Sequence, residues 1–129
     1  MSAALGASAP AESTLSGFVY RQYAWRKPLP SSVRLEGRLA VVTGGNVGLG
    51  LEASRQLLSR GLSRLVMASR SDERGARAAE ALRAEFPTAT IDVWQLDMAS
   101  YDSVVAFARR CDAELPTIDY VLLNAGVQH

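Results

Sequence analysis

The amino-acid sequence predicts an α/β domain built on a doubly wound parallel sheet. The first observation is a series of short, continuous apolar runs, which are typical of strands buried on both faces of a parallel sheet. The second is that a segment with helical periodicity separates each run from the next. One strand and one helix together take roughly thirty residues, as expected of a right-handed crossover unit. The apolar runs are residues 39–42, 65–68, 91–96 and 120–123.

The first predicted strand, residues 39–42, runs into a glycine-rich turn and then into the first helix. Gly61 is expected to end that helix, because glycine readily adopts the left-handed conformation of a helix C-terminus. The residues that form the apolar face of the helix are Leu51, Ala53, Leu57 and Leu58. The second strand, residues 65–68, follows this helix.

The second helix is predicted over residues 74–86, where Ala, Arg and Glu are frequent and Pro87 follows. After the third strand, residues 91–96, a third helix is expected from Ser100 to about residue 115, before Pro116. Its apolar positions are Val104, Val105, Phe107 and Ala108. The fourth strand, residues 120–123, is the last predicted element.

These elements form the first half of a Rossmann-type fold, truncated after the fourth strand. The usual strand order of such folds is 3-2-1-4, with a ligand cleft between strands 1 and 4. We predict three parts: a disordered tail over residues 1–16, an aromatic and proline-rich arm over residues 17–38, and the half-domain over residues 39–129. The arm is expected to pack on the domain surface, or alternatively to contact a partner or a membrane.

The bulk composition is that of an ordinary soluble domain. Its 129 residues have room for one hydrophobic core, and 14 basic against 13 acidic side chains give a formal charge of +1. This net charge is too small to attract nucleic acid or an anionic membrane electrostatically. No apolar run is long enough to span a bilayer, no signal peptide is visible, and the single cysteine, Cys111, excludes an internal disulfide. We expect Cys111 to be buried, and we expect the protein to be cytoplasmic.

The glycine-rich turn after the first strand predicts a bound dinucleotide. Glycines at 44 and 48 let the chain turn tightly and bring backbone N–H groups close to a pyrophosphate, and one at 50 lets the helix pack on the sheet. The following helix presents its free N–H groups and positive dipole end to the anion. The alternative is a tight turn that binds nothing. The predicted cofactor contacts here are Gly44, Asn46, Val47, Gly48, Leu49 and Gly50.

The end of the second strand predicts the form of the cofactor. Ser69 and Arg70 stand about twenty residues after the last glycine, where such sites read the adenosine ribose. An acidic residue there accepts a hydrogen bond from the ribose 2′-hydroxyl, whereas a hydroxyl and a guanidinium can donate to a 2′-phosphate. We therefore predict NADP(H) rather than NAD(H). The alternative is that Arg70 pairs with Asp72 or Glu73 on the surface.

The last two strands end in further candidate cofactor residues. Asp97 can accept a hydrogen bond from the adenine amino group, or it can cap the following helix, for which Ser100 is better placed. Asn124 can bridge the end of the fourth strand to the neighbouring backbone, and Gly126 lets the chain pass close to the cofactor.

Together these motifs resemble the short-chain dehydrogenase/reductase family. The family's Thr-Gly-x-x-x-Gly-x-Gly is present as residues 43–50, and its Asn-Asn-Ala-Gly is present as residues 123–126 with Leu123 in place of the first Asn. Three features look like the fungal, retinol-dehydrogenase-like branch of this family. They are that replacement, the sequences of residues 43–53 and 93–97, and the aromatic segment before the first strand. Many members of this branch act in secondary metabolism. The resemblance implies reduction of a small-molecule carbonyl, or oxidation of an alcohol.

The family's catalytic groups are a Ser and a Tyr-x-x-x-Lys pair located well after the Asn-Ala-Gly turn, where the lysine lowers the pKa of the proton-transferring tyrosine. No such pair follows Gly126 in these 129 residues. Tyr23 and Lys27 have the spacing but precede the first strand, and a terminal His129 has no triad partner in view. We thus expect a cofactor-binding half that is marginally stable and inactive alone, and no metal site.

Two alternatives remain open. One is a non-catalytic dinucleotide- or partner-binding module, and the unpaired edge of the fourth strand favours self-association. The other is a methyltransferase of similar fold, which Arg70 disfavours because adenosylmethionine sites usually present an acidic residue to the ribose hydroxyls.

Overall fold

The structure of the chain is a computed structural model that describes residues 30–126. The chain divides into two units, Met1–Val33 and Arg34–His129. The tail predicted for residues 1–16 and most of the arm predicted for residues 17–38 lie outside the described residues. In the described end of the first unit, the Val33 N–H donates to the Pro30 carbonyl at 3.2 Å.

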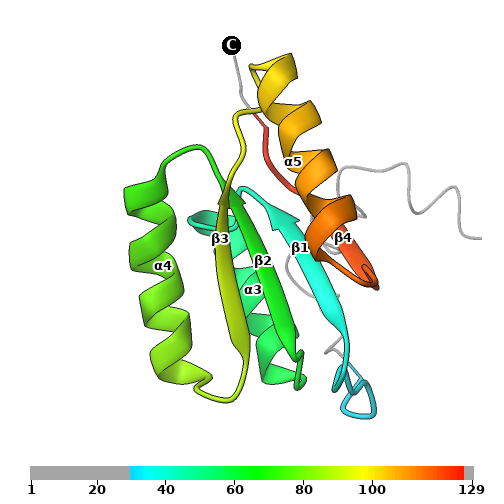
Figure 1. Cartoon of the computed structure of the whole chain (residues 1–129). Coiled ribbons are helices and arrows are strands. Elements are labelled where there is room, and N and C mark those ends of the chain that lie inside the picture. Colours follow the sequence, from blue (N-terminus) through cyan, green and yellow to red (C-terminus); the bar gives the residue numbers. More distant parts are fainter. Residues whose placement is uncertain (1–29, 127–129) are drawn as a thin grey trace, which may run out of the picture. The chain divides into compact units, whose positions relative to one another are not determined.

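The second unit contains a four-stranded parallel sheet, as predicted. Its strands are β1 (Leu39–Thr43), β2 (Arg64–Ser69), β3 (Thr90–Gln95) and β4 (Tyr120–Leu123). Their order is β3-β2-β1-β4, which confirms the expected topology and places the first two strands in the middle (Figure 1). The four carboxyl ends therefore lie along one edge of the sheet.

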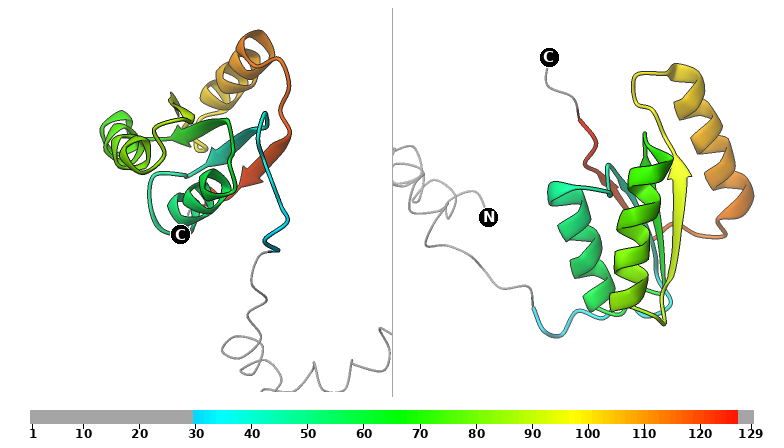
Figure 2. Two further views of the ribbon diagram at one scale, coloured as in Figure 1. Left: turned by 90° about the horizontal axis from the view of Figure 1, so that it is seen from below. Right: turned by 90° about the vertical axis from the view of Figure 1, so that its left-hand side faces the viewer.

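Three helices cover the sheet: α3 (Gly48–Ser59), α4 (Asp72–Glu85) and α5 (Tyr101–Glu114). The first two lie on one face and α5 lies on the other, as Figure 2 shows. This arrangement follows from right-handed crossovers on either side of β1.

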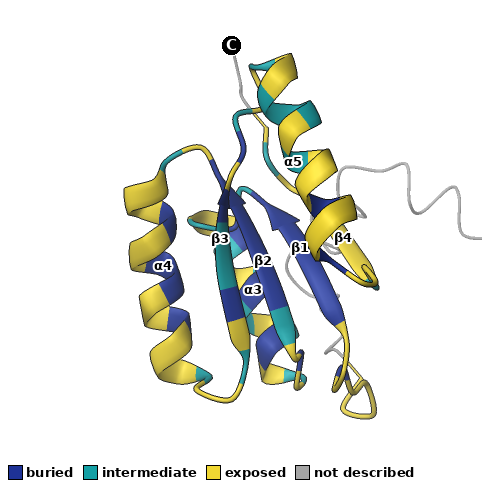
Figure 3. Cartoon of the chain, in the orientation of Figure 1, coloured by how far each residue is buried: buried dark blue, intermediate teal, exposed yellow. Residues whose placement is uncertain are grey.

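The core has two layers because neighbouring residues of a strand point to opposite faces. Val42 and Met67 belong to the cluster packed under α3 and α4, whereas Val41 and Val66 belong to a smaller cluster with Trp94 under α5. All of β1 and nearly all of β2 are buried (Figure 3), as unbroken apolar runs predict for central parallel strands.

The strand β4 lies at an edge of the sheet and is exposed, as the predicted unpaired edge of the fourth strand implies, although a continuous apolar run by itself favours burial on both faces. Val121 is 54% exposed and Leu123 81% exposed. Within the described residues, no strand pairs with the outer edge of β4. For the same reason the apolar face of α5 is only half-buried at Val104 and Phe107, although Cys111 is buried as predicted.

The helix ends follow local chemistry. Gly61 has φ +87° just after α3, which confirms its predicted role. Ser71 and Ser100 cap α4 and α5, each accepting the N–H three residues on through its side chain. Because Ser71 supplies the cap, α4 begins at Asp72, two residues before the predicted start.

The segment before β1 belongs to the sheet unit. Leu35 is buried in the core, and its N–H donates to the Arg60 carbonyl at 2.9 Å. Asp119 then ties β4 to the start of β1: its carboxylate accepts the Leu39 N–H at 2.9 Å and the Arg38 guanidinium at 2.8 Å. These two hydrogen bonds, that of the Leu39 N–H first, hold the pKa of the Asp119 carboxyl below its usual value.

Candidate functional site

The carboxyl ends of β1 and β4 are joined by the side chain of Thr43. Its hydroxyl oxygen accepts the N–H groups of Asn124 and Ala125, both at 3.0 Å. The hydroxyl itself lies 3.4 Å from the Leu122 carbonyl, to which it donates. Thr43 is 4% exposed, so these bonds are made inside the protein. Thr43 therefore fixes the point at which β4 leaves the sheet relative to the glycine turn.

The glycine turn begins with a residue that must be glycine. Gly44 has φ +65°, and a Cβ on it would lie 3.1 Å from the Ala125 Cα and 3.2 Å from Asn124 Nδ2. Only glycine adopts this conformation readily and leaves room for the end of β4. The predicted tight turn at Gly44 is therefore present.

Gly50 is crowded by the turn itself. A Cβ there would overlap the Gly44 carbonyl oxygen and lie 2.5 Å from Asn124 Nδ2. The prediction attributed this glycine to packing of the helix on the sheet, whereas the crowding comes from the turn and from β4. Gly48 differs from both, because it has φ +55° but no protein atom lies within 4 Å of its Cβ position.

The N-terminus of α3 is free to bind an anion. Its N-cap residue, Val47, makes no side-chain capping bond, and the first turn contains no acidic residue. The first N–H groups of a helix lack intrahelical partners, and they carry the positive end of the helix dipole. Val47 is 60% exposed and Leu49 83% exposed at the same place, and Asn46 is half-buried beside them.

Asn124 makes the bridge that the sequence predicted. Its side-chain amide donates to the carbonyl oxygens of Thr43 and Gly44, each at 3.3 Å. The glycine turn and the end of β4 are thus one assembly. Gly126, two residues further on, has no protein atom within 4 Å of its Cβ position.

At the end of β2 the structure separates the two residues that were predicted together. Ser69 is 1% exposed, and its hydroxyl donates to the Ser71 carbonyl at 2.9 Å. Its oxygen also accepts the Ser71 N–H, at 3.3 Å. Arg70 is exposed, and no ion pair involves it within residues 30–126. The alternative pairing of Arg70 with Asp72 or Glu73 is therefore not formed.

Asp97 lies at the end of β3, at the same edge of the sheet. One carboxylate oxygen accepts the Ala99 N–H at 3.0 Å, and its own N–H donates to Ser103 Oγ at 3.0 Å. Ser100 caps α5, so Asp97 is not the helix cap. A shallow hollow between α5 and β3 adjoins it, lined among others by Gln95, Asp102, Phe107 and Arg110.

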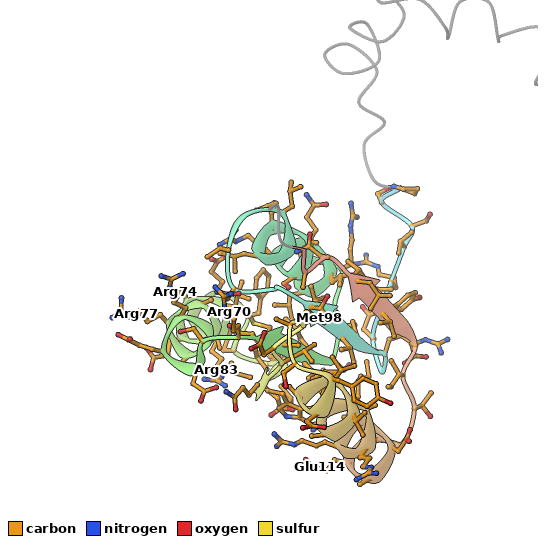
Figure 4. The ribbon with its side chains drawn as sticks, turned by 90° about the horizontal axis from the view of Figure 1, so that it is seen from above. Arg70, Arg74, Arg77, Arg83, Met98 and Glu114 are labelled. Atoms are coloured by element: carbon orange, nitrogen blue, oxygen red, sulfur yellow. The ribbon has the colours of Figure 1, made fainter. Side chains whose placement is uncertain are left out.

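All the predicted contact residues thus lie at the carboxyl edge of the sheet, and Figure 4 shows this edge from above. They form two groups: the glycine turn with the end of β4, and the ends of β2 and β3. An extended dinucleotide fits this layout, because the uncapped N-terminus of α3 and the open space beside Gly48 suit a pyrophosphate. The bridging role of Thr43 was not predicted, although a hydroxyl residue directly before the first glycine is a signal that could have suggested it.

Several other features do not extend this site. Within residues 30–126, no helix is long and apolar enough to cross a membrane, and no three His, Cys, Asp or Glu side chains are grouped to hold a metal ion. Tyr23, Lys27 and His129, considered above as catalytic candidates, lie outside the described residues. Burial raises the pKa of the Cys111 thiol, as expected for a structural cysteine.

Comparison with known sequences agrees with this geometry. The chain is 55% identical over 127 residues to short chain dehydrogenase virL of Hypocrea virens, covering 98% of this chain and 37% of that protein. It is 46% identical to short chain dehydrogenase opdN of Penicillium oxalicum, covering 98% of this chain and 40% of that protein. The chain thus spans about two fifths of the length of these fungal relatives.

Solved structures show the same fold. L-sorbose reductase from Gluconobacter frateurii, complexed with NADPH and L-sorbose, matches with a TM-score of 0.67 and 25% identity, covering 75% of this chain and 36% of that one. A metagenomic short-chain oxidoreductase in complex with NADP matches with a TM-score of 0.65 and 31% identity, covering 72% and 41%. The sequence model of the short chain dehydrogenases matches residues 38–129. The chain therefore belongs to the short chain dehydrogenase family of oxidoreductases.

Proposed function

We propose that this chain is the cofactor-binding half of an NADP(H)-dependent oxidoreductase. The observation that carries the proposal is the N-terminus of α3, which has no capping side chain and no acidic residue in its first turn. It opens beside the glycine turn, at the switch between β1 and β4 where ligands of such sheets bind. Membership of the family and the NADPH named for a structural relative support the same cofactor class.

The chain's own residues divide the work of binding. We assign the pyrophosphate to the backbone N–H groups of residues 48–50, because the first N–H groups of a helix lack intrahelical partners and no side chain caps them here. Asn124 ties the glycine turn to the end of β4. Asp97 has a second carboxylate oxygen that can accept a hydrogen bond from the adenine amino group. When bound, the nicotinamide ring of the cofactor supplies a hydride or accepts one.

The preference for NADP(H) over NAD(H) rests on Arg70. No acidic residue follows β2 directly, and Arg70 is exposed without an ion pair in the described part of the chain. A 2′-phosphate gains a charge-assisted hydrogen bond from such a guanidinium. Each bond of this kind contributes about 1.5–3 kcal/mol, so we expect a preference of roughly one to two orders of magnitude.

We propose that the substrate is a small-molecule carbonyl or alcohol, as the family implies. We also propose that the enzyme acts in fungal secondary metabolism. The 129 residues contain no Tyr-x-x-x-Lys after Asn124, where the family carries this pair. We therefore expect these residues to bind cofactor without catalysing its turnover. The single cysteine, Cys111, is free and buried, which is compatible with our proposal of a cytoplasmic protein.

A second function, binding of another protein chain, is favoured by the edge of β4. Leu123 is 81% exposed and Val121 54% exposed on a strand that pairs with β1 alone within the described residues. Unpaired apolar edges promote association between chains. A dimer or larger assembly of this chain that Leu123→Lys dissociates, measured by sedimentation, is the expected result. A chain that remains monomeric at high concentration would exclude self-association.

The cofactor proposal is tested by thermal unfolding of the purified chain with NADPH, NADH or S-adenosylmethionine. A ligand at a hundredfold excess over its Kd stabilises the folded state by about 2.7 kcal/mol. For a domain of this size that raises Tm by about 10 °C or more. We expect this rise with NADPH, a smaller one with NADH and none with S-adenosylmethionine. Protection by S-adenosylmethionine alone would instead support the methyltransferase alternative.

A further inference from the structure

The edge of the sheet at β3 carries an arginine that occupies its backbone. Arg83, in the last turn of α4, donates to the Ile91 carbonyl through Nε at 3.2 Å and through Nη2 at 2.5 Å. It projects from a different side of the helix than Arg74 does (Figure 4). We propose that Arg83 blocks this edge, so that β4 of a second copy of the chain cannot pair with β3.

The Ile91 carbonyl is one of the groups that an added strand would need. Thr90 and Leu96 donate their N–H groups to carbonyls at or next to the two ends of β2. Because the direction of the backbone groups alternates along a strand, Ile91, Val93 and Gln95 point theirs away from β2. Within residues 30–126, no strand pairs with that side of β3. With the Ile91 carbonyl occupied, only residues 93–95 remain for pairing, which is at the lower limit of strand length.

A second feature of β3 also opposes strand addition. Asp92 is in register with Val66 and two residues from Trp94, and both of these lie in the cluster under α5. The Asp92 side chain is therefore on the same face, where it forms an ion pair with Arg64 at 2.8 Å. Both charged side chains are half-buried. Inward-pointing charges are typical of protected edge strands, because an apolar strand added beside them would remove their water.

The other edge of the sheet has neither feature. The residues of β4, Tyr120–Leu123, include no charge and no proline, and Val121 and Leu123 are exposed. Without Arg83, β4 of one copy could pair with β3 of the next copy. Such a contact joins two different surfaces, so it repeats without closing and builds filaments, whereas two β4 edges paired around a two-fold axis close as a dimer.

The role of Arg83 is therefore to set the size of the assembly. This inference rests on the self-association proposed above as a second function, and it limits that association to the β4 edge. The unaltered chain is then expected to stop at a dimer. A chain without the Arg83 guanidinium is expected to form larger assemblies, in which each β3 edge receives the β4 edge of another copy.

The test compares Arg83→Ala with Arg77→Ala, because Arg77 is exposed on the same helix and forms its ion pair with Glu73, inside α4. Sedimentation velocity of the purified chains measures assembly size over a range of concentrations. We expect species larger than a dimer in Arg83→Ala, and none in the unaltered chain or in Arg77→Ala. Adding Leu123→Lys to Arg83→Ala should remove the larger species, because the added charge makes β4 a poor partner.

Amide hydrogen exchange locates the new contact. The outward N–H groups of Val93 and Gln95 should exchange at least about tenfold more slowly in the Arg83→Ala assemblies than in the unaltered chain. If Arg83 only stabilised the packing of α4 on β3, its loss would instead speed exchange along β3 without enlarging the assembly. Arg83→Met, which keeps an unbranched side chain without a donor, is expected to behave as Arg83→Ala does and serves if the alanine variant unfolds.

Circular dichroism spectra that match the unaltered chain show that each variant is folded. Equal assembly sizes in Arg83→Ala and Arg77→Ala would overturn the role of Arg83, as would species larger than a dimer in the unaltered chain. An unaltered chain that stays monomeric would overturn self-association through β4. Association of Arg83→Ala with slowed exchange at Val93 and Gln95 would, in that case, still support the role of Arg83.

Discussion

Replacing Thr43 by valine is expected to lower the free energy of unfolding by about 2 kcal/mol. The Thr43 hydroxyl oxygen accepts two backbone N–H groups, those of Asn124 and Ala125, each at 3.0 Å. Valine puts a methyl group in place of that acceptor. A donor left unsatisfied in the interior costs about 1–3 kcal/mol. We take the middle of this range for the Ala125 N–H, for which no second acceptor lies within the described residues, and nothing for the Asn124 N–H, which also donates to the Leu122 carbonyl at 3.1 Å.

Thr43→Ser is the matched control, because it keeps the oxygen and removes only a methyl group. That group contributes about 1 kcal/mol when buried. The valine variant should therefore be about 1 kcal/mol less stable than the serine variant, which corresponds to a difference in Tm of about 4–8 °C.

Urea unfolding of the three proteins, followed by circular dichroism, measures these free energies. NADPH binding should fall in Thr43→Val and be kept in Thr43→Ser, because the hydroxyl holds the glycine turn to the end of β4. A valine variant as stable as the unaltered chain would refute the reasoning, since the hydrogen bonds would then contribute nothing.

Three further outcomes are expected. Gly50→Ala should cost about 1–3 kcal/mol of stability in urea unfolding, whereas Gly45→Ala, whose Cβ would meet nothing closer than 3.4 Å, should be tolerated. Asp119→Asn should destabilise the chain at pH 7. The pKa of Asp119 is held below its usual value, mainly by the Leu39 N–H, so the difference from the unaltered chain should shrink as pH falls below about 4 in unfolding titrations. Cys111 should react slowly with a thiol reagent at pH 8 and rapidly in urea, because burial raises its pKa; fast labelling of the folded chain would contradict this.

The sheet and its order could be predicted because the signals are local and repeated. The central strands β1 and β2 are nearly continuous apolar runs, whereas β3 is interrupted by Asp92. Each helix has its own periodicity and a terminal residue such as Ser100 or Gly61. The exposure of β4 could not be predicted from its run alone. Leu123 is as apolar as Val42, but Val42 lies in a central strand and Leu123 in an edge strand. Burial depends on neighbours in space as well as on residue type.

The candidate site was predictable in its residue types and less so in its contacts. The side chains of Thr43 and Asn124 meet only because β4 returns beside β1, about eighty residues later in the chain. Ser69 was predicted to offer its hydroxyl to a cofactor, yet that hydroxyl is used by the turn at Ser71. A residue's type indicates which hydrogen bonds it can make, and the local backbone decides which of them it makes.

The glycine turn shows which part of the motif argues for a ligand. Gly44 and Gly50 are required by the protein itself, since a Cβ on either would crowd the end of β4. Their presence would be explained even if nothing bound there. Gly48 is required by its positive φ, and the space beside it is open. The argument for an anion therefore rests on the N-terminus of α3, where a tight, empty turn would be expected to gain a capping side chain or an acidic residue, and the sequence provides neither.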